Sequence, residues 1–332
     1  MSGSVRITDV SPRDGLQNEP GVISTADKAE LVRLVGASGV DEVEVTSFVS
    51  PKWVPQLGDA ADLLPMCAAF KRSGQCYSVL VPNDKGMDGA GAVNAARPGL
   101  IDKISLFTAA SETFSRKNTN ASIDETLDRF RPVLKRAAAS GLAVRLYVSC
   151  AIACPFEGDI APERVAAVVQ RLLILAGHDD FAPKSNGGRT FANVEIDLGD
   201  TIGAGTEAGT RRLLDAVQRL DAWTAFSWCD RPLVLHLHDT FGRAAECVRA
   251  ALEMGVRSFD GSVAGLGGCP YASTPGHRAP GNIATETLVR TIQGAGFSTR
   301  VDLARLADAA AFARDTVARA RAAQADKDRP RA

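Results

Sequence analysis

Eight short runs rich in β-branched residues recur along the chain, and longer stretches with helical spacing separate them. Strands that alternate with helices in this way predict repeated βα units around a parallel sheet. Eight such units are the number that closes a TIM barrel. We therefore expect an α/β fold, a TIM (β/α)8 barrel with a short C-terminal helical extension. The expected strands cover residues 5–10, 42–48, 76–82, 102–108, 143–149, 193–199, 232–238 and 257–263.

The length of 332 residues fits one domain of this kind, because α/β barrels use this much sequence for a single core. We expect a catalytic domain over residues 1–318 and a C-terminal tail over residues 319–332, which forms either a frayed helix or a disordered segment. The polar, glycine-rich segment 178–192 predicts a surface insertion at the barrel face opposite the usual active-site end. Residues 263–281 are expected to form a Gly-rich active-site loop.

Charge and hydropathy exclude several classes of protein. The formal net charge is -1, and Lys and Arg are spread along the chain, which disfavours a nucleic-acid partner or a membrane surface. No apolar run reaches the roughly 18 residues of a membrane span. The first residues lack a signal-peptide core, so we expect a cytoplasmic protein. The seven cysteines are odd in number and scattered, which favours reduced thiols.

The expected strands each have an apolar and a polar face, because strand side chains alternate. If the apolar faces pack against helices, the polar faces line the barrel interior, where unpaired carboxylates would be costly. A divalent cation together with internal Arg and Lys residues would compensate them. The alternative is a polar core that satisfies itself without a metal. The polar faces carry Glu42, Glu44, Thr46, Arg145, Tyr147, Ser149, Glu195, Asp197, His236 and His238.

The first candidate ligands are His236 and His238, which share one strand face with α-carbons about 7 Å apart and could converge on one ion. The alternative is a histidine pair of the core or surface. Arg13 and Asp14 follow the first strand, at the end where barrel enzymes keep their catalytic groups. Asp14 is therefore the natural third ligand. Arg13 could polarise a carbonyl or hold an enolate oxygen, although Arg-Asp pairs are also common in turns.

A Gly-rich segment, residues 265–270, follows the last expected strand and carries Cys269. Such a loop can close over a substrate, although Gly-rich segments also bind phosphate or simply turn. We interpret Cys269 as a proton donor to a carbanion or as a redox-sensitive residue of this loop. Cys150 and Cys154 resemble a metal-binding cysteine pair, but no second pair follows to complete a tetrahedral zinc site.

The chain resembles the hydroxymethylglutaryl-CoA lyase family, one of the metal-dependent Claisen-type barrels that also include isopropylmalate and homocitrate synthases. The resemblance covers nearly the whole chain and rests on long, ordered segments rather than on one motif. These segments are SPRDGLQNE (11–19), EVTSFVSPKWVPQLGD (44–59), YVSCAIACPFEG (147–158), LGDTIGAGT (198–206), HLHDTFG (236–242), VAGLGGCPYA (263–272) and GNIATE (281–286).

The resemblance implies cleavage of 3-hydroxy-3-methylglutaryl-CoA to acetoacetate and acetyl-CoA. It implies an acyl-CoA substrate, Mg²⁺ or Mn²⁺ as the cofactor, and a homodimer or higher homo-oligomer. The implied metal ligands are Asp14, His236, His238 and Asn282. The implied catalytic residues are Arg13, Cys269, His236, Glu44 and Asp200. The expected substrate contacts are Arg13, Gln17, Ser111, Tyr147 and Thr201.

Three alternatives to this activity stay open. The first is a lyase for a related, longer-branched 3-hydroxy-3-alkylglutaryl-CoA or a similar acyl-CoA. Segment 271–282 is longer than the resemblance predicts, which would make the loop and the acyl pocket differ from those of the family. The second is a Claisen-type synthase, which is disfavoured because those relatives add a long C-terminal region. The third is a barrel without catalytic activity that serves in binding.

Overall fold

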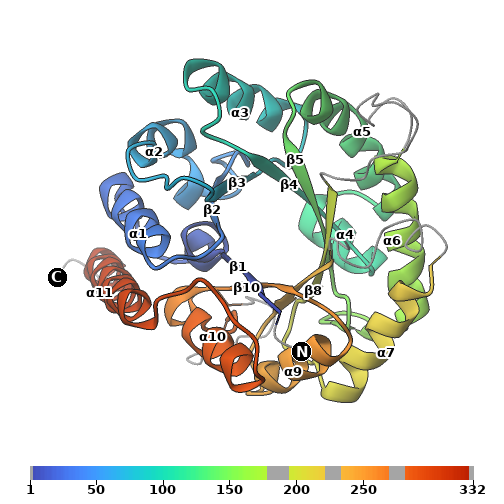
Figure 1. Ribbon diagram of the computed structural model, residues 1–332. Coiled ribbons are helices and arrows are strands. Elements are labelled where there is room, and N and C mark those ends of the chain that lie inside the picture. The colour runs from blue at the N-terminus through green and yellow to red at the C-terminus, as the bar shows by residue number, and fades with distance from the viewer. Residues whose placement is uncertain (1–2, 178–193, 221–232, 269–280, 329–332) are drawn as a thin grey trace.

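The computed structural model describes residues 3–177, 194–220, 233–268 and 281–328 (Figure 1). Eight parallel strands close into a barrel in the order β1-β10-β9-β8-β5-β4-β3-β2. Every strand starts and ends within two residues of its predicted range, so the predicted TIM barrel is confirmed. The strands are β1 (Arg6–Asp9), β2 (Glu42–Ser47), β3 (Cys76–Leu80), β4 (Lys103–Ala109), β5 (Ala143–Ser149), β8 (Val194–Asp200), β9 (Leu233–Leu237) and β10 (Ser258–Gly261).

Helices form the outer ring around these strands in Figure 1. They are α1 (Thr25–Ala37), α2 (Ala60–Cys67), α3 (Asp84–Ala96), α4 (Glu112–Thr119), α5 (Ile123–Ala139), α6 (Pro162–Ala176), α7 (Glu207–Gln218), α9 (Ala244–Glu253), α10 (Thr285–Gly294) and α11 (Leu303–Asp328). The remaining elements are the short helical turns η1 (Ser11–Gly15), η2 (Pro55–Leu57) and η3 (Val263–Gly265), and a two-stranded sheet of β6 (Ala153–Cys154) and β7 (Gly158–Asp159). Among the described helices, none combines the length and hydropathy of a membrane span.

Side-chain caps fix where two of these helices begin. The Ser24 hydroxyl accepts a hydrogen bond from the Asp27 backbone N–H at the start of α1. Ser122 and Glu125 cap each other's backbone N–H groups at the start of α5. These bonds satisfy N–H groups that have no partner inside the helix. Each cap therefore sets the rotation of its helix, and with it the face that packs on the barrel.

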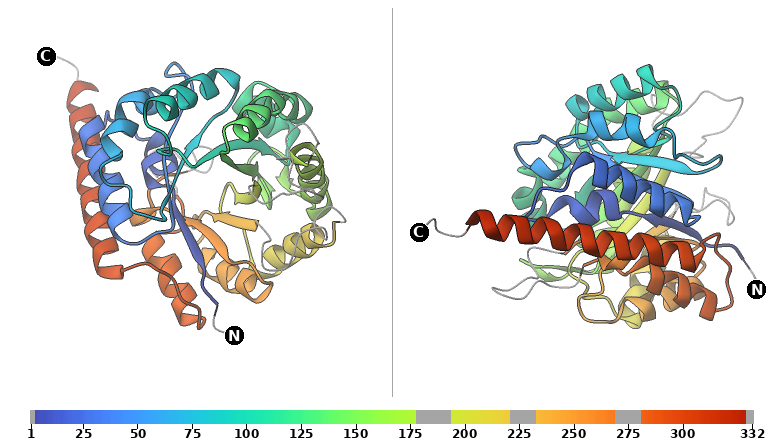
Figure 2. Two further views of the ribbon diagram at one scale, coloured as in Figure 1. Left: turned by 45° about the horizontal axis from the view of Figure 1, so that its top comes forward. Right: turned by 90° about the vertical axis from the view of Figure 1, so that its left-hand side faces the viewer.

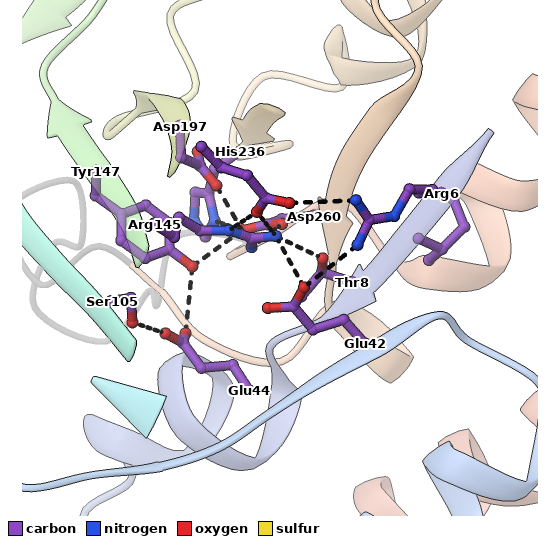
Figure 3. Close-up of polar contacts among 12 residues, drawn as sticks. Arg6, Thr8, Glu42, Glu44, Ser105, Arg145, Tyr147, Asp197, His236 and Asp260 are labelled. Atoms are coloured by element: carbon purple, nitrogen blue, oxygen red, sulfur yellow. Dashed lines mark hydrogen bonds and ion pairs between the residues drawn. The ribbon is translucent and has the colours of Figure 1, made fainter. Parts of the chain in front are cut away.

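The barrel interior is polar and is crossed by one long side chain (Figure 3). Arg145 is fully buried and donates hydrogen bonds to Thr8 (3.0 Å), Glu42 (3.3 Å), Glu195 (3.0 Å) and Asp260 (2.9 Å). The predicted apolar faces are buried on the other side of the strands, against the helices. The predicted division of the strands into an outer apolar and an inner polar face is therefore confirmed.

Lys103 provides the second interior cation. Its ammonium lies 2.5 Å from a Glu42 oxygen and 2.7 Å from a Glu195 oxygen, at the N-terminal ends of the strands. Arg6 also reaches Glu195, at 3.2 Å, so three cations lie against the carboxylates at this end of the barrel. These pairs agree with the alternative of a polar core without a metal, whereas the candidate metal ligands lie at the opposite, C-terminal end.

The last helix crosses the predicted boundary at residue 318. α11 runs without a break to Asp328, so residues 319–328 are helical, the first of the two forms predicted for this segment. Figure 2 shows it lying along α1 on the side of the barrel. Arg321 pairs with the buried Glu19 at 2.8 Å, and this contact holds the final turns against the barrel. The predicted insertion 178–192 and residues 269–280 of the predicted loop lie outside the described residues.

Candidate metal centre and active site

The first part of the site is the tight turn η1, which follows β1. The backbone N–H groups of Asp14 and Gly15 both donate to the Val10 carbonyl, at 2.8 Å and 3.2 Å. This pattern gives a turn wider than an α-helix, of a kind that is frequent at functional sites. It places Arg13 and Asp14 side by side over the C-terminal end of the barrel.

Asp9 anchors this turn to the last part of the chain. Its buried carboxylate accepts hydrogen bonds from the Ser11 backbone (2.9 Å), the Val263 backbone (3.1 Å) and the Thr285 hydroxyl (2.6 Å). η1, η3 and the start of α10 are therefore held at one point. The sequence prediction did not single out Asp9, and its only signal was its position at the end of a strand, next to the Arg13 turn.

His236 and His238 lie at the C-terminal end of β9, where they meet Asp14. The two Nε2 atoms are 3.4 Å apart, and His236 Nε2 is 4.0 Å from Asp14 Oδ2. The three potential ligand atoms all lie within 4.8 Å of one another. Among the described residues this is the one His, Cys, Asp or Glu group with the geometry to hold a metal ion. The structure thus brings together the three ligands that strand parity and position predicted.

The charges of these three side chains also fit a cation. Burial alone would raise the pKa of Asp14, but Arg13 and the two histidines outweigh it and lower the pKa to about 2. Burial and His236 lower the pKa of His238 to about 4, so this imidazole is neutral at pH 7. One carboxylate and two imidazole nitrogens directed at a common point are suitable ligands for a divalent ion. The donor set therefore fits the metal that the resemblance implies.

Asn282, the fourth predicted ligand, is held beside this group by main-chain pairing. It forms an antiparallel bridge with His238, and its side-chain nitrogen donates to Asp14 Oδ2 (2.8 Å) and to the Leu266 carbonyl (3.0 Å). The amide nitrogen thus faces Asp14, whereas a cation would need the amide oxygen. The structure places Asn282 at the site, and its role as a ligand stays a prediction.

The described part of the Gly-rich loop passes close to Asn282. Gly267 has a φ of +94°, and a β-carbon there would lie 2.7 Å from the Asn282 side-chain nitrogen. A larger residue would be strained and would push the amide away from Asp14. The glycine at this position therefore lets the loop approach the metal ligands. Cys269, the predicted catalytic thiol, lies outside the described residues.

Arg13 is buried next to the candidate metal site and binds two carboxylates. Its Nε and Nη2 atoms lie 2.6 Å and 2.5 Å from Glu44 Oε2, and its Nη1 donates to Asp14 at 2.7 Å. Burial lowers the pKa of Arg13, but Glu44 and Asp14 raise it more, so the side chain stays charged. A guanidinium carries five N–H groups, so further donors remain for a substrate oxygen.

Tyr147 lies on the interior floor of the site, between Glu44 and Asp260. Its hydroxyl is 3.3 Å from an oxygen of each carboxylate, and its ring meets the edge of His236. Burial and these two carboxylates raise the pKa of Tyr147 well above its ordinary value. The hydroxyl therefore stays protonated and donates to one carboxylate at a time.

Among the other predicted residues, Gln17 lies at the site and Ser111 serves a different contact. The Gln17 side chain donates to Asp14 Oδ1 at 3.2 Å. The Ser111 hydroxyl caps the Phe114 N–H at the start of α4 and donates to Glu157 at 2.7 Å. These bonds engage the Ser111 oxygen in local structure, so its substrate contact stays a prediction.

Asp200 and Thr201 shape the loop after β8. The Asp200 carboxylate accepts from the backbone of Ala204 (3.0 Å) and Gly205 (2.8 Å), and the Thr201 hydroxyl accepts from the Cys150 backbone at 2.7 Å. Burial raises the pKa of Asp200 to about 6, although these backbone hydrogen bonds lower it in part. Both side chains thus fold the rim of the site, and their predicted chemical roles stay predictions.

The fold and the site together define a TIM-barrel protein with a candidate divalent-metal centre at the C-terminal end of its strands. The model of the HMGL-like family matches residues 4–313. The mitochondrial hydroxymethylglutaryl-CoA lyase of Bos taurus is 44% identical over 308 residues, which cover 93% of this chain and 84% of that protein. The chain belongs to the HMGL-like family.

Two further relatives are bacterial. A 3-hydroxy-3-isohexenylglutaryl-CoA/hydroxy-methylglutaryl-CoA lyase of Pseudomonas aeruginosa is 41% identical over 305 residues, covering 92% of this chain and 90% of that protein. The crystal structure of an HMG-CoA lyase from Brucella melitensis superposes with a TM-score of 0.80 at 40% identity. That comparison covers 95% of this chain and 99% of the other, so the relatives share the whole barrel.

Proposed function

We propose that this protein is a carbon-carbon lyase that cleaves 3-hydroxy-3-methylglutaryl-CoA to acetoacetate and acetyl-CoA, with Mg²⁺ or Mn²⁺ as cofactor. One observation carries the proposal. Asp14, His236 and His238 converge within 4.8 Å beside the buried Arg13, in a chain whose relatives are named for this reaction. Asp14, His236 and His238, with Asn282 as the predicted fourth ligand, would hold the ion. When bound, the ion supplies Lewis-acid polarisation of substrate oxygens.

The reaction is a retro-Claisen cleavage. The tertiary hydroxyl loses its proton to a base, the adjacent carbon-carbon bond breaks, and the hydroxyl carbon becomes the ketone of acetoacetate. The electron pair of the broken bond forms the enolate of the acetyl thioester, which then takes up a proton. An acid near Cys269 or His236 is the proposed source of the final proton.

Arg13 stabilises the charge that develops in this step. Its guanidinium is fixed by Glu44 and Asp14 before substrate binds, so it need not reorganise when the enolate oxygen becomes negative. Glu44 is itself held by hydrogen bonds from Ser105 and Tyr147. We infer that Glu44 acts by orienting Arg13.

The metal is tested by removing it. Protein treated with EDTA should lose turnover of 3-hydroxy-3-methylglutaryl-CoA and recover it with Mn²⁺ or Mg²⁺. His238→Ala should bind Mn²⁺ weakly in a calorimetric titration and show no recovery. Full activity in the chelated protein, or in His238→Ala, would exclude the proposed metal mechanism.

A second candidate substrate is a longer-branched 3-hydroxy-3-alkylglutaryl-CoA. The Pseudomonas aeruginosa relative is named for both an isohexenyl and a methyl substrate, at 41% identity. Steady-state consumption of the two thioesters, with mass spectrometry of the products, separates the candidates. Good turnover of the isohexenyl thioester with none of the methyl one would replace the first proposal. A homo-oligomeric state and a cytoplasmic location stay predictions.

A further inference from the structure

The imidazole nitrogen of His236 that faces away from the candidate metal site contacts a carboxylate, that of Asp260. His236 Nδ1 lies 3.2 Å from Asp260 Oδ2 (Figure 3). His236 Nε2 faces His238 and Asp14. His236 and Asp260 are register partners on the neighbouring strands β9 and β10. The contact is therefore built into the barrel and does not depend on a surface loop.

Asp260 is itself fixed from a second side. Its Oδ1 atom accepts from Arg145 at 2.9 Å, and Oδ2 lies 3.3 Å from the Tyr147 hydroxyl. The side chain is completely buried. The Oδ1 contact with Arg145 is a buried ion pair, which favours the carboxylate form of Asp260. An ionised carboxylate can only accept hydrogen bonds, so the His236 Nδ1 atom must carry the proton.

We propose that Asp260 is a positioning residue for the metal centre, which fixes the tautomer of His236 so that its Nε2 lone pair is free for the ion. Metal-bound histidines commonly donate their second N–H to a carboxylate, and losing that partner weakens metal binding. Arg145 serves the same purpose indirectly, because it keeps one oxygen of Asp260 turned away from His236. The inference rests on the proposed metal function of Asp14, His236 and His238.

An alternative explanation is that Asp260 only balances the charge of Arg145. Glu195 provides the matched control, because it also pairs with Arg145, at 3.0 Å. Glu195 also pairs with Arg6 and Lys103, at the far end of the strands from the histidines. Glu195→Gln therefore removes a comparable charge from the same arginine while the support of His236 remains.

Asp260→Asn should reverse the His236 tautomer. An amide has one oxygen, and the Arg145 cation competes for it most strongly, so the amide nitrogen turns toward His236 Nδ1. The imidazole must then accept at Nδ1 and carry its proton on Nε2, where it blocks the metal. We expect Asp260→Asn to weaken Mn²⁺ binding about 10- to 100-fold. Glu195→Gln should change the dissociation constant less than about 3-fold.

The affinities are measured by calorimetric titration of metal-free protein with MnCl2, after circular dichroism has confirmed that each variant is folded. Equal Mn²⁺ affinity in folded Asp260→Asn and wild type would overturn the inference, as would equal weakening by Glu195→Gln. Wild type that binds no Mn²⁺ would instead refute the proposed metal function. The two failures are thus distinguishable.

A second measurement tests the inference in the wild-type protein and therefore does not depend on whether an Asp260 variant folds. In ¹⁵N spectra of metal-free wild type, the His236 signals are assigned by their loss in His236→Gln. In its neutral form the His236 ring should show a protonated Nδ1 and an unprotonated Nε2. The opposite tautomer in wild type would overturn the inference directly.

Discussion

Arg13 lies beside the candidate metal site and also forms a buried ion pair. It is the cation nearest the three candidate ligands, and it is the partner of the buried Glu44. A lysine at this position keeps the charge but lacks the planar fork that holds Glu44 and Asp14 together. Arg13→Lys should therefore lower kcat by about 10²- to 10³-fold, the usual cost of a lost oxyanion donor.

Arg33→Lys is the control for this change. Arg33 also forms a two-pronged contact, with Glu30 at 2.7 Å and 2.6 Å, but on the exposed surface of α1. Arg33→Lys should leave kcat unchanged. Steady-state kinetics and urea unfolding are measured on both variants. A loss of kcat in Arg13→Lys that merely follows a lower folded fraction would contradict the electrostatic role.

Asp200 should give the protein a pH-dependent stability. Its pKa is raised to about 6 in the folded state, whereas an unfolded Asp titrates near its model value of 3.8. Between these values the folded state holds the proton more tightly, so this group's contribution to stability falls as the pH rises from 4 to 6. The full difference is at most about 3 kcal/mol.

Asp200→Asn removes this titration. The unfolding free energy of the variant relative to wild type should therefore become more favourable between pH 4 and pH 7, by up to about 3 kcal/mol. Urea unfolding at several pH values measures the difference. A difference that stays constant across this range would show that Asp200 titrates normally.

The positions of single residues in the barrel were predictable where side chains alternate along a strand. Strand alternation placed His236 and His238 on the inner face, and position after β1 placed Asp14 beside them. The same alternation applied to β10 would have put Asp260 inside the barrel, opposite Phe259. It was missed because its partner, His236, comes from another strand, and register between strands is not visible in one sequence.

At the scale of elements, α11 depends on one close approach. A β-carbon at Gly21 would lie 2.1 Å from the backbone oxygen of Ala320, in the part of α11 beyond residue 318. Gly21→Ala should therefore push the end of α11 outward and lower the unfolding free energy by about 1–3 kcal/mol.

The same change is then made in a chain that ends at residue 318. Without Ala320 the three atoms nearest to the new methyl group are gone, so Gly21→Ala should cost less than about 0.5 kcal/mol in the shortened protein. Thermal unfolding of the four proteins forms a double-mutant cycle. An equal cost in both backgrounds would show that the strain comes from elsewhere.

Elements differed in how well the sequence predicted them. The strands and the capped helices α1 and α5 carry local signals, which are hydrophobic period and cap chemistry. The end of α11 carries none, because its Ala-, Arg- and Asp-rich residues fit a disordered tail as well as a helix. Tertiary contacts stabilise the helical form of this segment, namely the ion pair of Arg321 with Glu19 and the packing of Ala320 on Gly21.

At the scale of the whole molecule, the barrel interior holds two groups of charges that meet at Asp260, which contacts both Arg145 and His236. Lys103 and Arg145 neutralise the carboxylates at the N-terminal ends of the strands. At the opposite end, Arg13 forms ion pairs with Glu44 and Asp14, beside the candidate metal site. The sequence predicted that the interior is polar, but not this division, because it depends on how far the Arg145 side chain reaches across the barrel.

Arg145→Met tests the division. It leaves Glu42, Glu195 and Asp260 without their shared cation, and removing one partner of a buried ion pair costs about 3–5 kcal/mol. The control is Arg136→Met. Arg136 also binds two carboxylates, Asp84 at 2.8 Å and Asp88 at 2.9 Å, but on the surface.

Exposed pairs contribute about 0–1 kcal/mol, so Arg136→Met should leave stability almost unchanged. Urea unfolding is measured for both variants with and without saturating Mn²⁺. Because the ion would bind away from Glu42 and Glu195, at the C-terminal ends of the strands, it should not restore Arg145→Met to wild-type stability. Full restoration by Mn²⁺ would mean that a metal can replace the arginine, and that the interior forms one electrostatic unit instead of two.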